Sequence, residues 1–199
     1  MKSPIISQSI QIKNKNIHYL EAGQPDAPSV LLLHGASFRA KTWEEIGTIK
    51  QLTNQNYRVV AVDLPGYGTS ETISDEPVQF LVKLTDNLQL HNTVIVSPSM
   101  SGRYSLPFLI QHHESVRGFV AVAPVGILKM AEKLEGIQIP TLAIWGSNDQ
   151  IVPPSQADIL IQTMPNCQKA ILKNAGHACY LKAPNKFHEN LIQFLKSLK

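Results

Sequence analysis

The stretch VIVSPSMSG, residues 94–102, places a serine between a short apolar run and a segment with a helical pattern. Small residues, Ser97 and Ser101, stand two positions before and two positions after Ser99. A sharp turn from a strand into a helix needs small residues at these places, because their side chains point into the neighbouring strand and helix. The same letters also describe a serine-rich helix N-cap. The stretch therefore predicts a nucleophile elbow or a helix cap, and the surrounding sequence has to decide between them.

Apolar runs of this kind recur along the chain and alternate with helical patterns. Short continuous runs rich in Val, Ile and Leu are typical of parallel strands that are buried on both faces. Their alternation with amphipathic helices predicts a doubly wound α/β sheet. The runs lie at 29–33, 58–62, 93–96, 119–123, 141–145 and, more weakly, 170–172; the helical patterns lie at 42–52, at 78–88 with Ser74 or Asp75 as the expected cap, at 103–111 and at 187–198.

The first twenty residues follow a different pattern. Ile10, Ile12, Ile17 and Tyr19 alternate with polar residues on either side of the turn 13–16. Such alternation predicts an antiparallel hairpin with one face in solvent. The expected fold class is therefore α/β, with a mostly parallel doubly wound sheet and an N-terminal antiparallel hairpin.

The composition fits a globular protein and argues against nucleic-acid-binding, secreted and membrane-spanning proteins. The 199 residues are 43% hydrophobic and 17% charged, with a net charge of +3. This length predicts a single domain over residues 1–199. No run of Lys or Arg accompanies the small charge, so no nucleic-acid partner is expected. Residues 1–16 lack the apolar core of a secretory signal and no apolar run is long enough to cross a bilayer, so we expect a cytoplasmic protein without a membrane partner.

Two further residues with reactive side chains follow apolar runs. Asp149 comes just after the run 141–145, and His177 lies in the loop after 170–172. Taken singly, the aspartate also fits a helix cap or an Asx turn, and the histidine also fits a surface position. Together with Ser99 they follow the chain order serine, aspartate, histidine. Each is expected at the carboxyl edge of the sheet, where such sheets bind ligands. The combination predicts a catalytic triad.

Other candidates fit these roles less well. Asp63 follows a strand but lies in a Pro-Gly turn, and no acid follows the run that ends at Ala123. Among the three neighbouring serines, only Ser99 has small residues at both flanking places and the central position of the elbow. No other histidine lies in the loop after the last apolar run; the remaining ones are His18, His34, His91, His112, His113 and His188.

The loop after the run 29–33 supplies another part of the predicted site. It reads HGASF and begins at His34. In this type of site, a backbone N–H of that loop and the N–H of the residue after the nucleophile bind the oxyanion. The expected donors are Ala36 and Met100, and Gly35 lets the backbone approach a substrate closely. We interpret His34 as a structural residue that hydrogen-bonds the loop.

At this point the chain resembles the α/β-hydrolase family. The resemblance rests on five segments in the family's order: VLLLHGASF (30–38), YRVVAVDLPGYGTS (57–70), VIVSPSMSG (94–102), TLAIWGSND (141–149) and NAGHACYL (174–181). Within the family the chain is similar to the small group of abhydrolase-domain-containing protein 14. That narrower resemblance lies in SPSxSGxYSLPF (97–108), HGxxF…TW (34–43), DLPGxG (63–68) and GHxCYL (176–181).

The resemblance implies roles for individual residues. Ser99, Asp149 and His177 match the nucleophile, the acid and the base. The ordinary elbow of the family has glycines where Ser97 and Ser101 stand, whereas the narrower group shares the S-x-S-x-S pattern.

Several functions are compatible with these residues. The first is a serine hydrolase that cleaves small acyl esters through an acyl-enzyme intermediate. The resemblance also implies, as an alternative, an acyl transferase or deacetylase that passes acetyl from an amine such as lysine to a thiol such as coenzyme A. A third possible function is that of a non-catalytic binding module on a hydrolase scaffold. A lyase or a cofactor-free peroxidase is a further possible function. We expect no metal and no cofactor, and as partner a small acyl ester or an acylated side chain.

The two cysteines are not expected to take part in this chemistry. Cys167 and Cys179 are too few for a disulfide framework and lack the spacing of a metal site. Cys179 lies two residues past the proposed base, and a packed neutral thiol is its expected state.

The length of one interval bears on the substrate. Many α/β-hydrolases carry a helical cap before the strand that leads to the triad acid, but only 16 residues separate Ala123 from Pro140 (140 − 123 − 1). A plain crossover with its helix needs at least about 10–12 residues. We therefore expect no cap domain and an open shelf formed by loops, which suits short acyl groups or a side chain presented by a larger partner.

Overall fold

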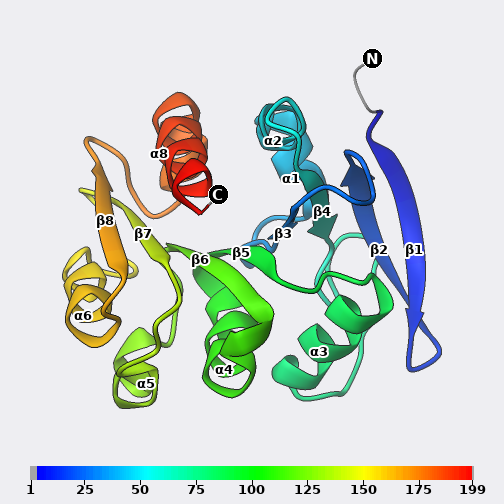
Figure 1. Cartoon of the computed structure of the whole chain (residues 1–199), viewed down its shortest axis with the longest axis horizontal. Coiled ribbons are helices and arrows are strands. Elements are labelled where there is room, and N and C mark those ends of the chain that lie inside the picture. The colour runs from blue at the N-terminus through cyan, green and yellow to red at the C-terminus, as the bar shows by residue number, and fades with distance from the viewer. Residues whose placement is uncertain (1–3, 199) are drawn as a thin grey trace.

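The computed structural model describes residues 4–198, and within them helices cover both faces of an eight-stranded sheet (Figure 1). The central strands, β3 to β7, form at the apolar runs because those residues lose their contact with water on both faces of the sheet. Their bounds are β1 Ile6–Ile12, β2 Lys15–Ala22, β3 Ser29–Leu32, β4 Arg58–Val62, β5 Thr93–Pro98, β6 Val116–Val122, β7 Thr141–Gly146 and β8 Cys167–Leu172.

The helices alternate with the strands from β3 onwards. The α-helices are α1 Ala40–Glu45, α2 Thr48–Thr53, α3 Pro77–Asn87, α4 Gly102–His112, α5 Ile127–Leu134, α6 Ser155–Thr163, α7 Cys179–Lys182 and α8 Pro184–Ser197, and the short 3-10 helices are η1 Ser99–Ser101 and η2 His113–Ser115. Among these helices, none is both long and apolar enough to span a membrane.

The order of strands across the sheet is β1-β2-β4-β3-β5-β6-β7-β8. The β1–β2 and β2–β4 pairs are antiparallel, and every other pair is parallel. The predicted fold class is therefore confirmed, hairpin included. The hairpin turn is tighter than predicted, because Lys13 and Asn14, with φ of 50° and 60°, reverse the chain and Lys15 already pairs with Ile12.

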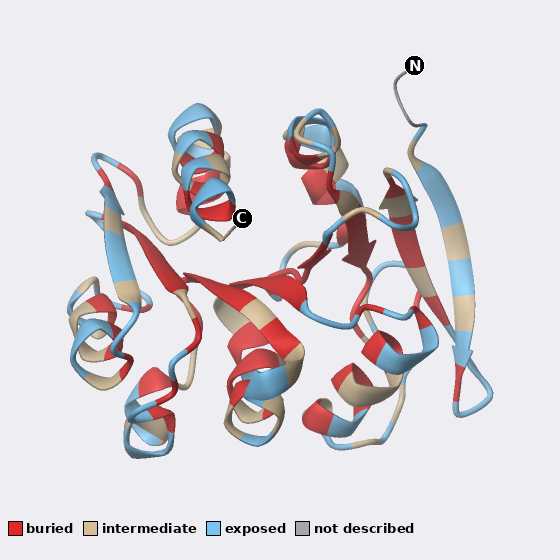
Figure 2. Ribbon diagram, in the orientation of Figure 1, coloured by how far each residue is buried: buried red, intermediate tan, exposed pale blue. Residues whose placement is uncertain are grey.

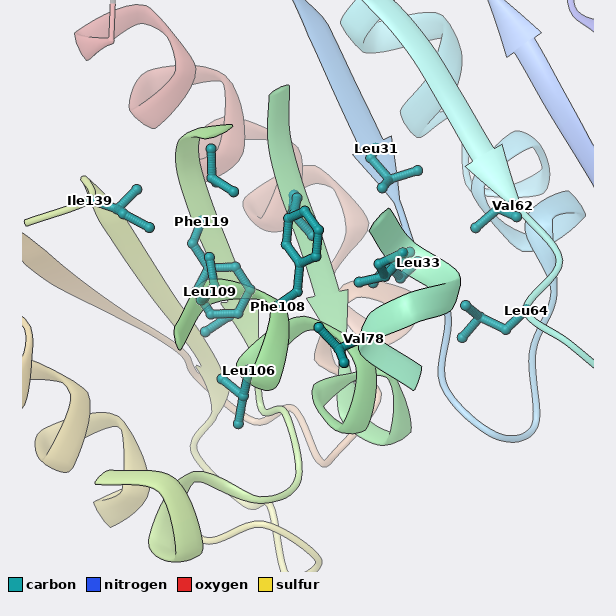
Figure 3. Close-up of a cluster of buried hydrophobic side chains, with 14 of the residues drawn as sticks. Leu31, Leu33, Val62, Leu64, Val78, Leu106, Phe108, Leu109, Phe119 and Ile139 are labelled. Atoms are coloured by element: carbon teal, nitrogen blue, oxygen red, sulfur yellow. The ribbon is translucent and has the colours of Figure 1, made fainter. Parts of the chain in front are cut away.

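Two apolar layers lie on opposite faces of the sheet. One layer packs under α1, α2, α7 and α8, and the other under α3, α4, α5 and α6 (Figure 1). Successive residues of β3 serve both layers: Val30 faces the first and Leu31 the second. Burial is accordingly continuous along the central strands (Figure 2), and Figure 3 shows the second layer, where Phe108 of α4 lies with Phe119 of β6.

Two predicted helices differ in detail from the structure. The pattern at 42–52 is not one helix but two, α1 and α2, because Gly47 adopts a left-handed φ of 78° between them. Helix α3 begins after Glu76, without a side-chain cap. The expected cap Asp75 instead pairs with Lys13 and, at 2.9 Å, with Lys83.

The interval between β6 and β7 carries only α5, which packs against α4 and α6 beside the sheet. The expectation of a fold without a cap domain is confirmed, and the carboxyl edge of the central strands is covered by loops.

Candidate active site

Ser99 stands at a strained turn, directly after β5 and as the first residue of η1. Its φ is 51°, a left-handed conformation that is uncommon for a residue with a side chain. The turn is fixed from the adjacent loop, because the Val125 N–H donates to the Ser99 carbonyl oxygen at 2.9 Å. Gly102 is required for this approach, since a Cβ there would lie 2.3 Å from the Val125 carbonyl oxygen. The strand-to-helix turn predicted at Ser99 is therefore present in the fold.

The small residues around the elbow form a buried cluster of hydroxyl groups. The Ser97 hydroxyl lies 3.0 Å from that of Ser101 and 2.7 Å from that of Ser105. The Ser101 hydroxyl also donates to the Pro98 carbonyl oxygen at 2.8 Å. All three serines are fully buried. Serine fits beneath this elbow because its hydroxyl finds partners there, so no polar group is left unsatisfied.

The structure brings Ser99, His177 and Asp149 into one chain of hydrogen bonds. Ser99 Oγ lies 2.7 Å from His177 Nε2, and His177 Nδ1 lies 2.8 Å from Asp149 Oδ2. The second carboxylate oxygen of Asp149 accepts the N–H groups of Ile151 at 2.9 Å and Val152 at 3.0 Å. Asp149 is 5% exposed, so its negative charge faces these donors rather than water. The carboxylate is thereby held with one oxygen directed at the imidazole.

The loops that carry Asp149 and His177 are joined by backbone contacts. The Ser147 N–H donates to the Leu172 carbonyl oxygen at 3.0 Å, and the Asn148 N–H to the Ala175 carbonyl oxygen at 2.9 Å. These contacts need Gly146, because a Cβ there would lie 2.2 Å from the Gly176 carbonyl oxygen. The acid and the histidine therefore keep a fixed separation although they stand 28 positions apart in sequence.

The loop that follows β3 passes directly over the elbow. A Cβ on Gly35 would lie 3.4 Å from the Ser99 Cβ, so a glycine at this position leaves space between the loop and the serine. Aromatic packing supports the loop from below: the Phe38 ring lies edge-on to Tyr180, with centroids 6.0 Å apart, and Tyr180 stacks on Trp43 at 5.0 Å. Ala36, the next residue of this loop, lines the same cavity as Ser99.

His34 uses both ring nitrogens to hold this loop. Nδ1 donates to the Gly35 carbonyl oxygen at 2.8 Å, and Nε2 accepts the Leu64 N–H at 2.9 Å. Burial lowers the pKa of His34, which favours the neutral imidazole that this pairing requires. The structural interpretation of His34 agrees with these contacts.

A cavity of about 200 Å³ opens beside Ser99. Ile151 stands at its rim and is 69% exposed, and Val122 and Tyr180 contribute apolar walls. The sequence did not single out Ile151 or Tyr180, because both lie far from Ser99 in the chain and only the fold brings them to the same cavity. The cavity is lined by Gly35, Ala36, Ser37, Phe38, Pro98, Ser99, Val122, Ile151, His177, Ala178 and Tyr180.

The thiol nearest to this site is not poised for attack. Burial raises the pKa of Cys179 to about 12, and burial likewise raises that of Cys167 to about 12. Both thiols are therefore neutral near pH 7. No group of three or more metal-ligating side chains occurs between residues 4 and 198.

Sequence reasoning missed one pairing outside this site. His18 and Asp63 were each rejected as members of the predicted triad. In the structure they are paired, with His18 Nδ1 2.8 Å from Asp63 Oδ2, and His18 Nε2 lies 2.9 Å from Ser7 Oγ. No local signal announces the contact, because 45 residues separate the histidine from the aspartate and only the β2–β4 pairing brings them together.

The sheet order and the strained serine elbow with its histidine and aspartate define the class of protein, that of the α/β-hydrolases. A model of the alpha/beta hydrolase family matches residues 30–135, more than half of the chain. The chain belongs to the alpha/beta hydrolase family.

The chain is also similar to relatives within that family. Mouse "Protein ABHD14A" is 41% identical over 194 residues, which cover 93% of this chain and 78% of the mouse protein. A rat protein named "Putative protein-lysine deacylase ABHD14B" is 37% identical over an alignment of 202 positions, which covers 96% of this chain and 95% of the rat protein. The resemblance to the abhydrolase-domain-containing protein 14 group is therefore confirmed.

Solved structures share the fold at low sequence identity. A CIB-like hydrolase from Thermoplasma acidophilum has a TM-score of 0.94 at 22% identity, and the match covers 98% of this chain and 99% of that one. The carboxylesterase CesB from Bacillus subtilis has a TM-score of 0.86 at 19% identity, with 96% and 92% covered. At these identities the likeness concerns the fold alone.

Proposed function

We propose that this protein is a serine hydrolase that removes short acyl groups through an acyl-enzyme intermediate. The observation that carries the proposal is the continuous hydrogen-bond chain from Ser99 through His177 to Asp149, at a strained elbow that opens into a cavity. In this family such a chain makes a serine hydroxyl nucleophilic.

Each residue of the chain has a distinct task. Ser99 Oγ attacks the acyl carbon while His177 Nε2 takes its proton. Asp149 accepts the Nδ1–H of His177, keeps the ring in the correct tautomer and stabilises the imidazolium that forms. His177 then gives the proton to the leaving group, and it next activates the water that releases the acyl group from Ser99.

The oxyanion of the tetrahedral intermediate needs donors on the other side of the acyl carbon. We assign this role to the backbone N–H groups of Ala36 and Met100, since Ala36 lines the cavity and Met100 directly follows Ser99. The fixed position of the loop, held by His34 and by the Phe38–Tyr180 contact, supports preorganised donors.

The size of the cavity argues for a short acyl group. About 200 Å³ accepts an acetyl or similar group with part of its leaving group, and no cap encloses a longer chain. The leaving group then extends into solvent, where an alcohol or a side chain of a larger molecule is equally well accommodated.

The acylated side chain of a lysine is the second candidate substrate. It is favoured by the name of the rat relative, "Putative protein-lysine deacylase ABHD14B", and by the open shelf around Ser99. In this variant the leaving group is the lysine amine, and the acyl group passes to water or to a thiol acceptor.

The proposal is tested by labelling and by a substrate panel. A fluorophosphonate should modify the wild-type protein at Ser99, identified by peptide mapping, and should not modify a Ser99→Ala variant. Turnover of p-nitrophenyl esters should be greatest for acetate and fall with chain length. An adduct elsewhere, or ester turnover unchanged by Ser99→Ala, contradicts the proposal. Product analysis on an acetyl-lysine peptide, with and without coenzyme A, distinguishes water from a thiol as acceptor.

A further inference from the structure

A groove lies between β8, an outermost strand of the sheet, and α8, and Figure 1 shows where these two elements lie. Its volume is about 400 Å³. Five consecutive residues of the chain, 169–173, line one side, and Ala183, Lys186 and Asn190 line the other. A groove whose wall is an uninterrupted stretch of strand backbone has the shape of an extended peptide.

Some backbone N–H and carbonyl groups of β8 point away from β7 and make no strand pair in the described part of the chain. Among the described strands, β8 pairs with β7 alone. The carbonyl oxygens of Asn166 and Leu172 accept N–H groups from the β7 side. Because backbone groups of a parallel strand alternate in direction, Lys169 and Ile171 direct theirs away from β7. The strand thus has an open edge, and Lys169 and Ile171, whose backbone groups point to it, are among the residues that line the groove.

The side chains around the groove are mainly cationic. Lys173 and Lys186 line it, whereas Lys169 and Ile171 reach it with their backbone, because they alternate along β8 with Ala170 and Leu172, which face α8. Asp158 pairs with Lys169, and Glu189 pairs with Lys186 at 2.6 Å. No acidic partner is recorded for Lys173 in residues 4–198. Since Lys169 and Lys186 already have acidic partners, Lys173 carries the remaining positive charge at the groove, and an acidic segment complements it better than a second copy of the same lysine does.

The groove leads to the candidate active site. A second hollow lies next to it and is lined by Asn174, Lys182 and His177 among others. Asn174 and Lys182 are chain neighbours of the groove residues Lys173 and Ala183. His177 and Ala178 belong both to this hollow and to the cavity beside Ser99. A chain in the groove is therefore directed toward His177 at the carboxyl end of β8.

We propose that the groove binds an extended acidic segment of a protein substrate, which adds as a further strand to β8 and presents an acylated lysine to Ser99. This inference rests on the proposed function, in its acyl-lysine form. Main-chain hydrogen bonds to β8 supply affinity, and the lysines select glutamate or aspartate beside the acylated residue.

Binding is measured without turnover, so that its failure is distinguishable from failure of the proposed hydrolysis. The protein carries Ser99→Ala, and the probe is a short fluorescent peptide with acetyl-lysine at its centre and glutamate alternating with valine on both sides. Fluorescence anisotropy gives Kd. Lys173→Glu combined with Lys186→Glu should weaken binding about tenfold or more, because two attractive contacts become repulsive. The matched control combines Lys50→Glu with Lys133→Glu, which changes the net charge equally away from the groove and should leave Kd unchanged.

A second measurement addresses strand addition itself. N-methylation of alternate peptide amides removes the hydrogen bonds to β8 in one register only, so one methylated peptide should lose about tenfold in affinity or more while its counterpart retains it. The proposal is overturned if the groove variant and the control variant lose peptide affinity equally. It is also overturned if both methylated peptides bind equally well, or if a lysine-flanked peptide binds more tightly than the glutamate-flanked one. A dimer in sedimentation velocity that the groove variants dissociate would overturn it as well. Wild-type hydrolysis of p-nitrophenyl acetate, measured separately, reports on the proposed function alone.

Discussion

Two Ser–His–Asp hydrogen-bond chains run through this molecule, one at Ser99 and one at Ser7. In both, the histidine Nδ1 lies 2.8 Å from an aspartate Oδ2. The histidine Nε2 lies 2.7 Å from Ser99 Oγ in the first chain and 2.9 Å from Ser7 Oγ in the second. Both aspartates are buried and accept two backbone N–H groups. Hydrogen-bond lengths alone therefore do not distinguish the chain at Ser99 from the chain at Ser7.

Their surroundings differ. Ser99 has a φ of 51° at an elbow, and a cavity and the Gly35 loop adjoin it. Ser7 is an exposed residue inside β1, paired across the hairpin with Leu20. Its aspartate, Asp63, uses its oxygens to hold the start of α1 and the loop at Thr69. Under the proposed function, a hydrogen-bond chain of this kind acts as a reaction site only where a pocket and oxyanion donors adjoin the serine hydroxyl.

The largest expected effect separates the two serines. Ser99→Ala should lower kcat/KM on p-nitrophenyl acetate by about 10⁴-fold or more, because the nucleophile of the proposed acyl-enzyme is lost. Ser7→Ala is the matched variant and should leave kcat/KM unchanged. Circular dichroism checks that both variants fold. A comparable loss in Ser7→Ala would mean that the second hydrogen-bond chain takes part in the reaction.

The two aspartates should differ in the kind of damage they cause. Asp149→Asn should lower kcat about 10⁴-fold at little change in fold, because the amide favours the wrong tautomer of His177. Asp63→Asn should instead lower the free energy of unfolding by about 2–3 kcal/mol, since a buried carboxylate loses charge-assisted hydrogen bonds from Ala40, Thr69 and His18. Steady-state kinetics and urea denaturation measure the two effects. The reverse assignment of effects would contradict this reading.

The hydroxyl cluster under the elbow gives a smaller, structural effect. Ser97→Gly together with Ser101→Gly should lower the free energy of unfolding by about 2 kcal/mol, because Ser105 is left without its partner and two glycines gain freedom in the unfolded chain. The kcat should stay within a few-fold, since glycine also fits the elbow. Urea denaturation and ester kinetics test this pair; a collapse of kcat at intact stability would show that the hydroxyls act on Ser99 itself.

The smallest effect concerns a histidine outside both hydrogen-bond chains. His188 faces Thr48, at 2.9 Å, rather than a carboxylate, and burial lowers its pKa. As the pH falls, His188 is therefore protonated in the unfolded chain at a higher pH than in the folded protein. Its contribution to the free energy of unfolding is present above about pH 6.5 and is lost as the pH falls below that value. His188→Gln should flatten the decline in free energy of unfolding between about pH 6.5 and 5. An unchanged slope in urea titrations across that range would exclude His188 as its source.

Much of the fold follows from local sequence. The parallel strands form where the apolar runs predict them, and β4 has the predicted bounds 58–62. The single helix predicted at 42–52 fails because periodicity takes no account of a left-handed glycine at 47. The elbow at Ser99 can be predicted from the sequence because the sharp turn requires small residues only two positions before and after the serine, within one short stretch.

The sequence by itself determined the α/β class, the serine elbow and the order of Ser99, Asp149 and His177, because these depend on short spacings and on the edge where parallel strands end. The tertiary structure alone decided which residues meet. It joined His18 to Asp63, placed Tyr180 and Ile151 around the cavity, and left β8 with an open, lysine-lined edge. Such contacts arise between segments far apart in the chain, so no local pattern of side chains encodes them.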